Sequence, residues 1–237
     1  MKPILFNTDM VLAILAGRKT QTRRVIKHWV PNDAIWGYDV FTAGRERGEI
    51  ACRGTYEDGY GEKFFIPPFQ VGDLLYVRET WARFRGWCWG PVYVYKAGYD
   101  PKQLPPVYIT KWHWHPSIHM PKEAARIFLR VTGLRAERLQ DITNVDAVRE
   151  GCNPIWHRNE SGATVYEGTP IDSFRQVWDR TTTKYDWSVN PWVWVIDFER
   201  VSEAEAYGIE MTIPSLASGD KLDALAGFLK KIVEVNK

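Results

Sequence analysis

The sequence predicts a mixed α/β (α+β) protein with a β-barrel at its centre, short flanking helices and long loop insertions. Three observations lead to this fold class. Short segments rich in β-branched and aromatic residues are separated by Gly or Pro turns. Few segments carry apolar residues at helical spacing. The 237 residues suffice for one large domain or two small ones. Short strands with few helices favour a barrel over a parallel sheet.

The composition is that of a globular protein and excludes a bulk DNA-coating protein. Apolar residues make up 45% of the chain and charged residues 25%. The net charge is only +2, so any contact with nucleic acid has to come from local patches. The 12 tryptophans are numerous, and they serve either to fill the core or to stack on bases.

The cysteines and the N-terminus favour the cytoplasm. Cys52, Cys88 and Cys152 are odd in number, and their spacing fits neither a zinc site nor a disulfide framework. This usage is typical of a reducing compartment. The start of the chain lacks the apolar run of a signal peptide, and no apolar run is long enough to span a bilayer. We therefore expect no membrane contact, and neither a metal nor a cofactor.

The first element is a helix of about two turns that leads into a basic strand. Thr8 stands where an N-cap belongs, and Gly17 where a helix ends on a residue with positive φ. A strand is predicted over residues 20–26, which would place Thr22 and Arg24 on one face. The plain interpretation is a solvated basic edge. The functional one is an anion or substrate site.

The later elements follow from the same rules. Strands are predicted at Leu74–Glu79, Pro91–Ala97, Arg126–Leu139 and Trp192–Phe198. Helices are predicted over residues 141–151, where Thr143 caps and Asp146 stands at N3, over residues 170–180, and over residues 220–235. Loops or insertions are predicted over residues 28–62, 98–111 and 154–168. We expect the apolar stripe of residues 220–235 to be buried.

Two further groups invite a functional interpretation. Arg78 and Trp81 follow the end of a predicted strand, where they either line a pocket or form ordinary surface contacts. His113, His115 and His119 suggest a metal site. No carboxylate or cysteine completes that cluster, so we interpret His119 as part of a loop over a pocket.

Several segments resemble one known family. The run Gly17-Arg18-Lys19-Thr20-x-Thr22-x-Arg24 resembles the signature of the ASCH domain, a PUA-like β-barrel family linked to RNA. The opening residues 2–8, the run 71–81 (Val-Gly-Asp-Leu-Leu-Tyr-Val-Arg-Glu-Thr-Trp) and the run 114–121 (Trp-His-Pro-Ser-Ile-His-Met-Pro) resemble the longer ASCH proteins of bacteriophages and prophages.

The resemblance implies a domain organisation and a location. Residues 1–201 would form an ASCH/PUA-like domain with insertions at 28–62, 98–121 and 153–169. Residues 202–237 would be a C-terminal extension with an amphipathic helix. The location implied is the cytoplasm of a bacterial host.

The resemblance also implies an activity. Short ASCH proteins hydrolyse the acyl amide of N4-acetylated cytidine, and their catalytic groups correspond to Lys19, Thr22 and Glu150. A threonine hydroxyl needs a neighbouring base, and a lysine can serve as that base if its pKa is lowered. Arg24 would hold an oxyanion or position the ligand. The ligand-binding residues expected are Arg18, Arg24, Arg78, Trp81 and His119.

Two alternatives remain open at this stage. PUA-like barrels also bind RNA or a modified base without turnover, and the basic run and the tryptophans suit that equally. The third function is RNA cleavage, which we rank below the other two because no histidine is placed by motif as its acid or base. The partner expected is a nucleoside or single-stranded RNA. The oligomeric state does not follow from the sequence.

Overall fold

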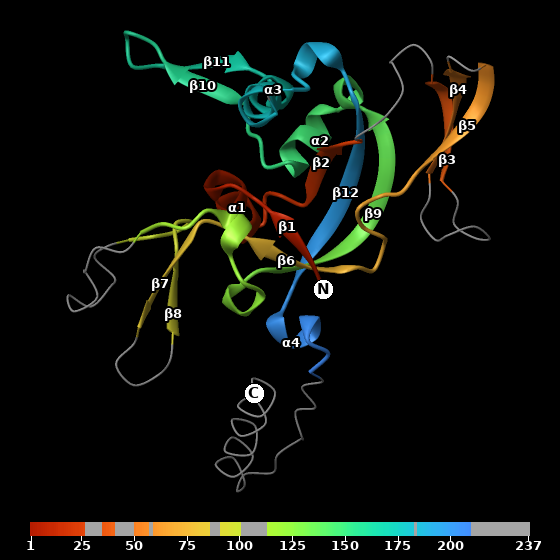
Figure 1. The fold of residues 1–237 in the computed structure, drawn as a ribbon. Coiled ribbons are helices and arrows are strands. Elements are labelled where there is room, and N and C mark those ends of the chain that lie inside the picture. Colours follow the sequence, from red (N-terminus) through yellow and green to blue (C-terminus); the bar gives the residue numbers. More distant parts are fainter. Residues whose placement is uncertain are drawn as a thin grey trace, which may run out of the picture. The chain divides into compact units, whose positions relative to one another are not determined.

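The protein has a mixed α+β fold (Figure 1). The computed structural model describes residues 1–26, 35–40, 50–56, 59–85, 91–100, 113–182 and 184–209. The chain divides into two compact units, Met1–Glu203 and Ala204–Lys237. The predicted helix over residues 220–235 lies outside the described residues.

The centre of the first unit is a five-stranded sheet in the order β1-β6-β9-β12-β2. The strands are β1 (Lys2–Leu5), β2 (Gln21–Val25), β6 (Leu74–Arg78), β9 (Phe128–Arg138) and β12 (Trp192–Val201). β1 runs parallel to β6, and the other neighbours are antiparallel. The predicted strands at residues 74–79, 126–139 and 192–198 are therefore confirmed.

Alternation along β12 gives the sheet two buried faces. Trp194 and Ile196 belong to one apolar cluster, and Val193 and Val195 to another. Helix α1 (Thr8–Leu15) packs Val11 and Ile14 into the first cluster. Helices α2 (Asn144–Arg149) and α3 (Pro170–Thr181) belong to the second. β12 is apolar and buried at the successive positions Trp192–Ile196 because both of its faces are covered there.

Side-chain caps fix where these helices begin. Asn7 caps α1 by accepting from the backbone N–H of Met10, so the cap lies one residue before the predicted Thr8. Thr143 and Asp146 form a capping box at α2, as predicted. Thr169 caps α3 in the same way. A helical turn, α4 (Glu203–Ala206), follows β12.

Segments predicted as insertions contain small sheets. β3 (Ile35–Val40), β4 (Ile50–Tyr56) and β5 (Gly59–Phe65) form a three-stranded sheet. Another small sheet lies outside those insertions: β7 (Trp81–Arg85) pairs with β8 (Pro91–Tyr95), which confirms the strand predicted at residues 91–97. Within the predicted insertion at residues 153–169, β10 (Ile155–Arg158) pairs with β11 (Thr164–Gly168). The loop predicted over residues 154–168 was wrong, because β10 and β11 form a hairpin whose side chains are mostly exposed. In the described part of the chain there are also 3₁₀ turns: η3 (Ser117–His119), η4 (Lys122–Ala124), η5 (Leu139–Asp141) and η6 (Trp187–Val189).

The two edge strands of the central sheet are β1 and β2. They do not pair with each other within the described residues, so the sheet is not closed into a barrel there. A side chain spans the gap instead: Nη2 of Arg24 on β2 donates to the backbone carbonyl of Leu5 on β1, at 2.7 Å.

Candidate functional site

The turn between α1 and β2 places Lys19. Gly17 has a φ of +71°, which ends α1, and the N–H groups of Arg18 and Lys19 then donate to the carbonyl of Ala13. Lys19 forms an isolated antiparallel bridge with Glu150, the residue that caps the C-terminus of α2. Backbone geometry thus brings these two residues together across 131 positions of sequence.

Gly151 allows this close approach. Its φ is +92°, and a Cβ at this position would lie 2.9 Å from the Cβ of Ala13 and 3.3 Å from that of Lys19. A side chain here would therefore be strained and would also push α1 and Lys19 away from α2.

Lys19 and Glu150 form a buried ion pair. The Lys19 ammonium lies 2.6 Å from Oε2 of Glu150, and it also donates to the carbonyls of Gln21 at 2.8 Å and Glu150 at 2.9 Å. Lys19 is only 2% exposed. Burial lowers the pKa of Lys19, and the neighbouring Glu150 carboxylate opposes that shift. A lysine in this setting can exchange a proton more readily than an exposed one.

Arg23 holds the other oxygen of Glu150. Its Nη1 lies 3.2 Å from Oε1 of Glu150 and donates to the side-chain oxygen of Gln21 at 2.6 Å, while Nη2 donates to Glu137. The sequence indicated Arg18 and Arg24 as ligand-binding residues, but it did not indicate Arg23 as one. The alternation of side chains along a strand could have identified Arg23, because it places Arg23 and Gln21 on the face opposite Thr22.

A wider network supports Arg23 on that face. Arg135 pairs with Glu137 at 3.0 Å and with Asp197 at 2.9 Å. The amide nitrogen of Gln21 donates to Asp197 at 2.6 Å. Since Arg23 reaches both Glu137 and Glu150, this network joins the partly exposed acids to the buried pair and limits how far the Glu150 carboxylate can move.

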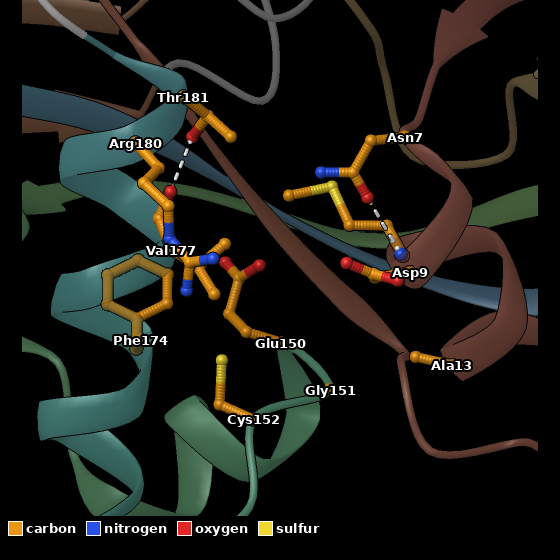
Figure 2. Close-up of a pocket in the computed structure, with 11 residues that line it drawn as sticks. Asn7, Asp9, Ala13, Glu150, Gly151, Cys152, Phe174, Val177, Arg180 and Thr181 are labelled. Atoms are coloured by element: carbon orange, nitrogen blue, oxygen red, sulfur yellow. Dashed lines mark hydrogen bonds between the residues drawn. The ribbon is translucent and has the colours of Figure 1, made fainter.

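Glu150 lines a pocket of about 190 Å³ (Figure 2). The pocket lies between residues of α1 and α3, and the Glu150 side chain points into it. Phe174 and Val177 of α3 supply apolar surface, and Arg180 adds a cation from the same helix. The lining also includes Cys152, the pKa of which is raised by burial. No histidine is among the described lining residues.

Thr22 lies close by in sequence but lines no pocket described here. Thr22 is 2% exposed and lies on β2, where it is paired with Ile196 of β12. Neither the Glu150 pocket nor a second, more open groove has Thr22 in its wall. Lys19 also lies behind the pocket wall, so Glu150 is the group of the predicted catalytic three that reaches the pocket.

The two flanking arginines point to different places. The exposed Arg18 donates from Nη1 to the carbonyl of Gly151 at 3.1 Å. Arg24 lines the second groove, not the Glu150 pocket. Arg24 and Lys19 nevertheless approach one ring: the Arg24 Cζ lies 5.4 Å and the Lys19 Nζ 5.6 Å from the centroid of Phe6.

Arg78, Trp81 and His119 line neither cavity. Arg78 donates to the carbonyls of Met120, at 2.8 Å, and Ile118, and so holds the η3 turn. Trp81 is buried in a separate apolar cluster with Met120. His119 is exposed.

Within the described ranges, no group of three or more His, Cys, Asp or Glu side chains could hold a metal ion. No helix of the described part is long and apolar enough to cross a membrane. The chain matches no protein-family model, no curated protein and no solved structure.

Proposed function

We propose that the protein is an ASCH-type hydrolase with a PUA-like fold that cleaves the acyl amide of an N4-acylated cytosine, in a nucleoside or in RNA. The observation that carries the proposal is the buried Lys19–Glu150 pair beside a small pocket, with the two groups 2.6 Å apart. It joins a lysine of lowered pKa to a carboxylate that reaches the pocket.

The reaction needs a base, a nucleophile and an acid. Neutral Lys19 takes the proton of a hydroxyl, which adds to the acyl carbonyl carbon. The carbon–nitrogen bond then breaks, and a proton relayed through Glu150 leaves with the amine of cytosine. If the hydroxyl belongs to Thr22, water hydrolyses the acyl-threonine in a second step. If it belongs to water, the acid is released directly.

Single substitutions test the proposal. Lys19→Ala, Thr22→Ala and Glu150→Gln should each lower turnover of N4-acetylcytidine by about 10²–10⁴-fold. The double variants should be little worse, because such groups act as a unit. Acetate release is measured, and circular dichroism checks the fold. Glu79→Gln is the control, because Glu79 is another buried carboxylate that lines neither cavity.

The outcomes separate the roles. If the wild-type protein releases no acetate from the nucleoside or from acetylated RNA, the proposed hydrolase activity is refuted. A Thr22→Ala variant that keeps the wild-type rate would identify water as the attacking group, in agreement with the absence of Thr22 from the pocket wall.

A second function is binding of the modified base without turnover. One observation favours it: the Lys19 ammonium already donates to three protein acceptors, so all three of its protons are engaged. Saturable binding of N4-acetylcytidine with no release of acetate would support this function over the hydrolase.

A further inference from the structure

A groove of about 710 Å³ lies where the central sheet is open. Its walls are residues 3–5 of β1, residues 24–26 at the end of β2, Trp194 of β12, and Ile66, Pro68 and Phe69. Ile66 is 68% exposed at this groove. Among the described residues, the lining is apolar apart from one cationic residue, Arg24.

Arg24 is held in place but has no carboxylate partner within the described residues. Nη2 donates to the carbonyl of Leu5 at 2.7 Å, and the guanidinium lies 5.4 Å from the ring centroid of Phe6. Arg23 and Arg126, by contrast, are each paired with an acid. Burial lowers the pKa of Arg24, and the charge of the Glu150 carboxylate opposes that shift without forming an ion pair with it.

These features define the chemistry of a ligand. A guanidinium presents five N–H donors in a fixed fork that suits phosphate or carboxylate. One donor is engaged by Leu5, and the orientation of the fork is set before a ligand arrives. The apolar wall around it suits a flat organic group attached to the anion.

We propose that this groove binds the phosphate of a nucleotide through Arg24, with the adjoining nucleoside against the apolar wall. The proposal deepens the proposed function and rests on it for the choice of a nucleotide over another organic anion. Phe6 relates the two sites, because the Lys19 ammonium and the Arg24 guanidinium both lie over its ring, 5.6 Å and 5.4 Å from the centroid. Since Lys19 pairs with Glu150, this ring links the groove to the buried ion pair.

The test compares three unreactive probes by isothermal titration calorimetry: cytidine, cytidine 5′-monophosphate and inorganic phosphate. Wild type should bind the monophosphate about 10-fold more tightly than cytidine, the effect expected of charge-assisted hydrogen bonds. Arg24→Met should abolish that difference, and Arg24→Lys should keep part of it. Ile66→Glu, a change at an exposed position, should weaken monophosphate binding by adding a negative charge.

Arg138→Met is the matched control, because Arg138 also donates to a backbone carbonyl and lies over an aromatic ring, that of Trp192, but lines neither cavity. It should leave the difference intact. Equal binding of cytidine and the monophosphate by wild type, or an Arg24→Met variant that keeps the difference, overturns the proposal. Inorganic phosphate binding as tightly as the monophosphate refutes the part played by the apolar wall. Since no probe is hydrolysed, a failed hydrolase assay leaves this result interpretable.

Discussion

Two ion pairs in this protein, one buried and one partly buried, use opposite charges in different ways. Lys19 and Glu150 meet beside a pocket, through a single ammonium. Glu79 and Arg126 meet through two parallel bonds of 2.9 Å, and the Arg126 guanidinium lies 4.1 Å from the ring centroid of Tyr95. No cavity described here includes Glu79 or Arg126.

The difference separates a candidate site from a structural clamp. A lysine can change its protonation state when burial lowers its pKa, whereas an arginine stays charged. Arg126 also donates to the carbonyl of Ala97 at 2.8 Å, so it ties two segments together. A buried charge is therefore a functional candidate when its proton can move and a cavity adjoins it.

The largest expected effect is on the free energy of unfolding, and it comes from replacing a glycine that lies beside each ion pair. Gly151→Ala should lower the free energy of unfolding by about 3 kcal/mol, because positive φ and a close contact with Ala13 both oppose a Cβ. Gly98→Ala, next to the Arg126 contact, should cost about 1 kcal/mol, since only its φ of +79° opposes the change. Urea denaturation gives both values, and equal costs would contradict the close packing at Gly151.

The next effect is on turnover. It compares replacement of Arg23, which lies beside the Lys19–Glu150 pair, with replacement of Arg126, which is a member of the second pair. Arg23→Lys should lower turnover of N4-acetylcytidine about tenfold, because one ammonium cannot hold Gln21, Glu137 and Glu150 together. Arg126→Lys is the matched control and should leave turnover unchanged.

The pH profile of turnover makes this test specific. If Arg23 only supports the fold, Arg23→Lys would change stability but leave the profile of the remaining activity where it was. If it positions Glu150, the profile should shift, because the field at Lys19 changes with that carboxylate. If the Arg23→Lys variant keeps full activity and an unshifted pH profile of turnover, Arg23 does not position Glu150.

The smallest effect is the pH dependence of stability. The folded-state pKa of Lys19 is lowered, so between that pKa and the ordinary 10.5 the unfolded chain holds more protons. The free energy of unfolding should then rise with pH, by at most about 1.4 kcal/mol per pH unit. Lys19→Met should remove this slope from the alkaline limb.

Glu79 should affect the pH dependence of stability on the acid side of the profile, with a sign opposite to that of Lys19. Burial raises its folded-state pKa above 4.5, so the stability it contributes is full below that value and is lost as pH rises through the folded-state pKa. Glu79→Gln should flatten this limb and leave the alkaline one unchanged. Denaturation at a series of pH values measures the free energy of unfolding on both the acid and the alkaline side. A Lys19→Met variant that changes only the acid side, or a Glu79→Gln variant that changes only the alkaline side, would contradict the assignment.

The sequence predicted the elements whose signals are local. The capping box at Thr143, the helix from Pro170 and the long strand through Val131 all depend on neighbours within a few positions. The β10–β11 hairpin was missed because its strands are mostly exposed, which removes the buried-face pattern on which strand prediction depends.

The site could be predicted only in part. The resemblance named Lys19 and Glu150, which the fold brings into contact, but the burial of Thr22 away from the pocket lining depends on packing. The two sides of β2 also had different partners: Arg23 meets acids from β9 and α2, and Arg24 meets β1. Such partners lie far away in sequence, so no local pattern reports them.

The position of β2 has a consequence for synthesis on the ribosome. Among the described strands, β2 pairs only with β12, near the end of the described chain, and the carboxylate opposite Lys19 belongs to residue 150. Because the N-terminus is made first, the basic segment around Lys19 emerges long before either partner exists. A nascent or truncated chain that lacks β12 has this strand without its sheet neighbour, and one that ends before Glu150 lacks the carboxylate that pairs with Lys19. The pair therefore forms only after most of the polypeptide has been made.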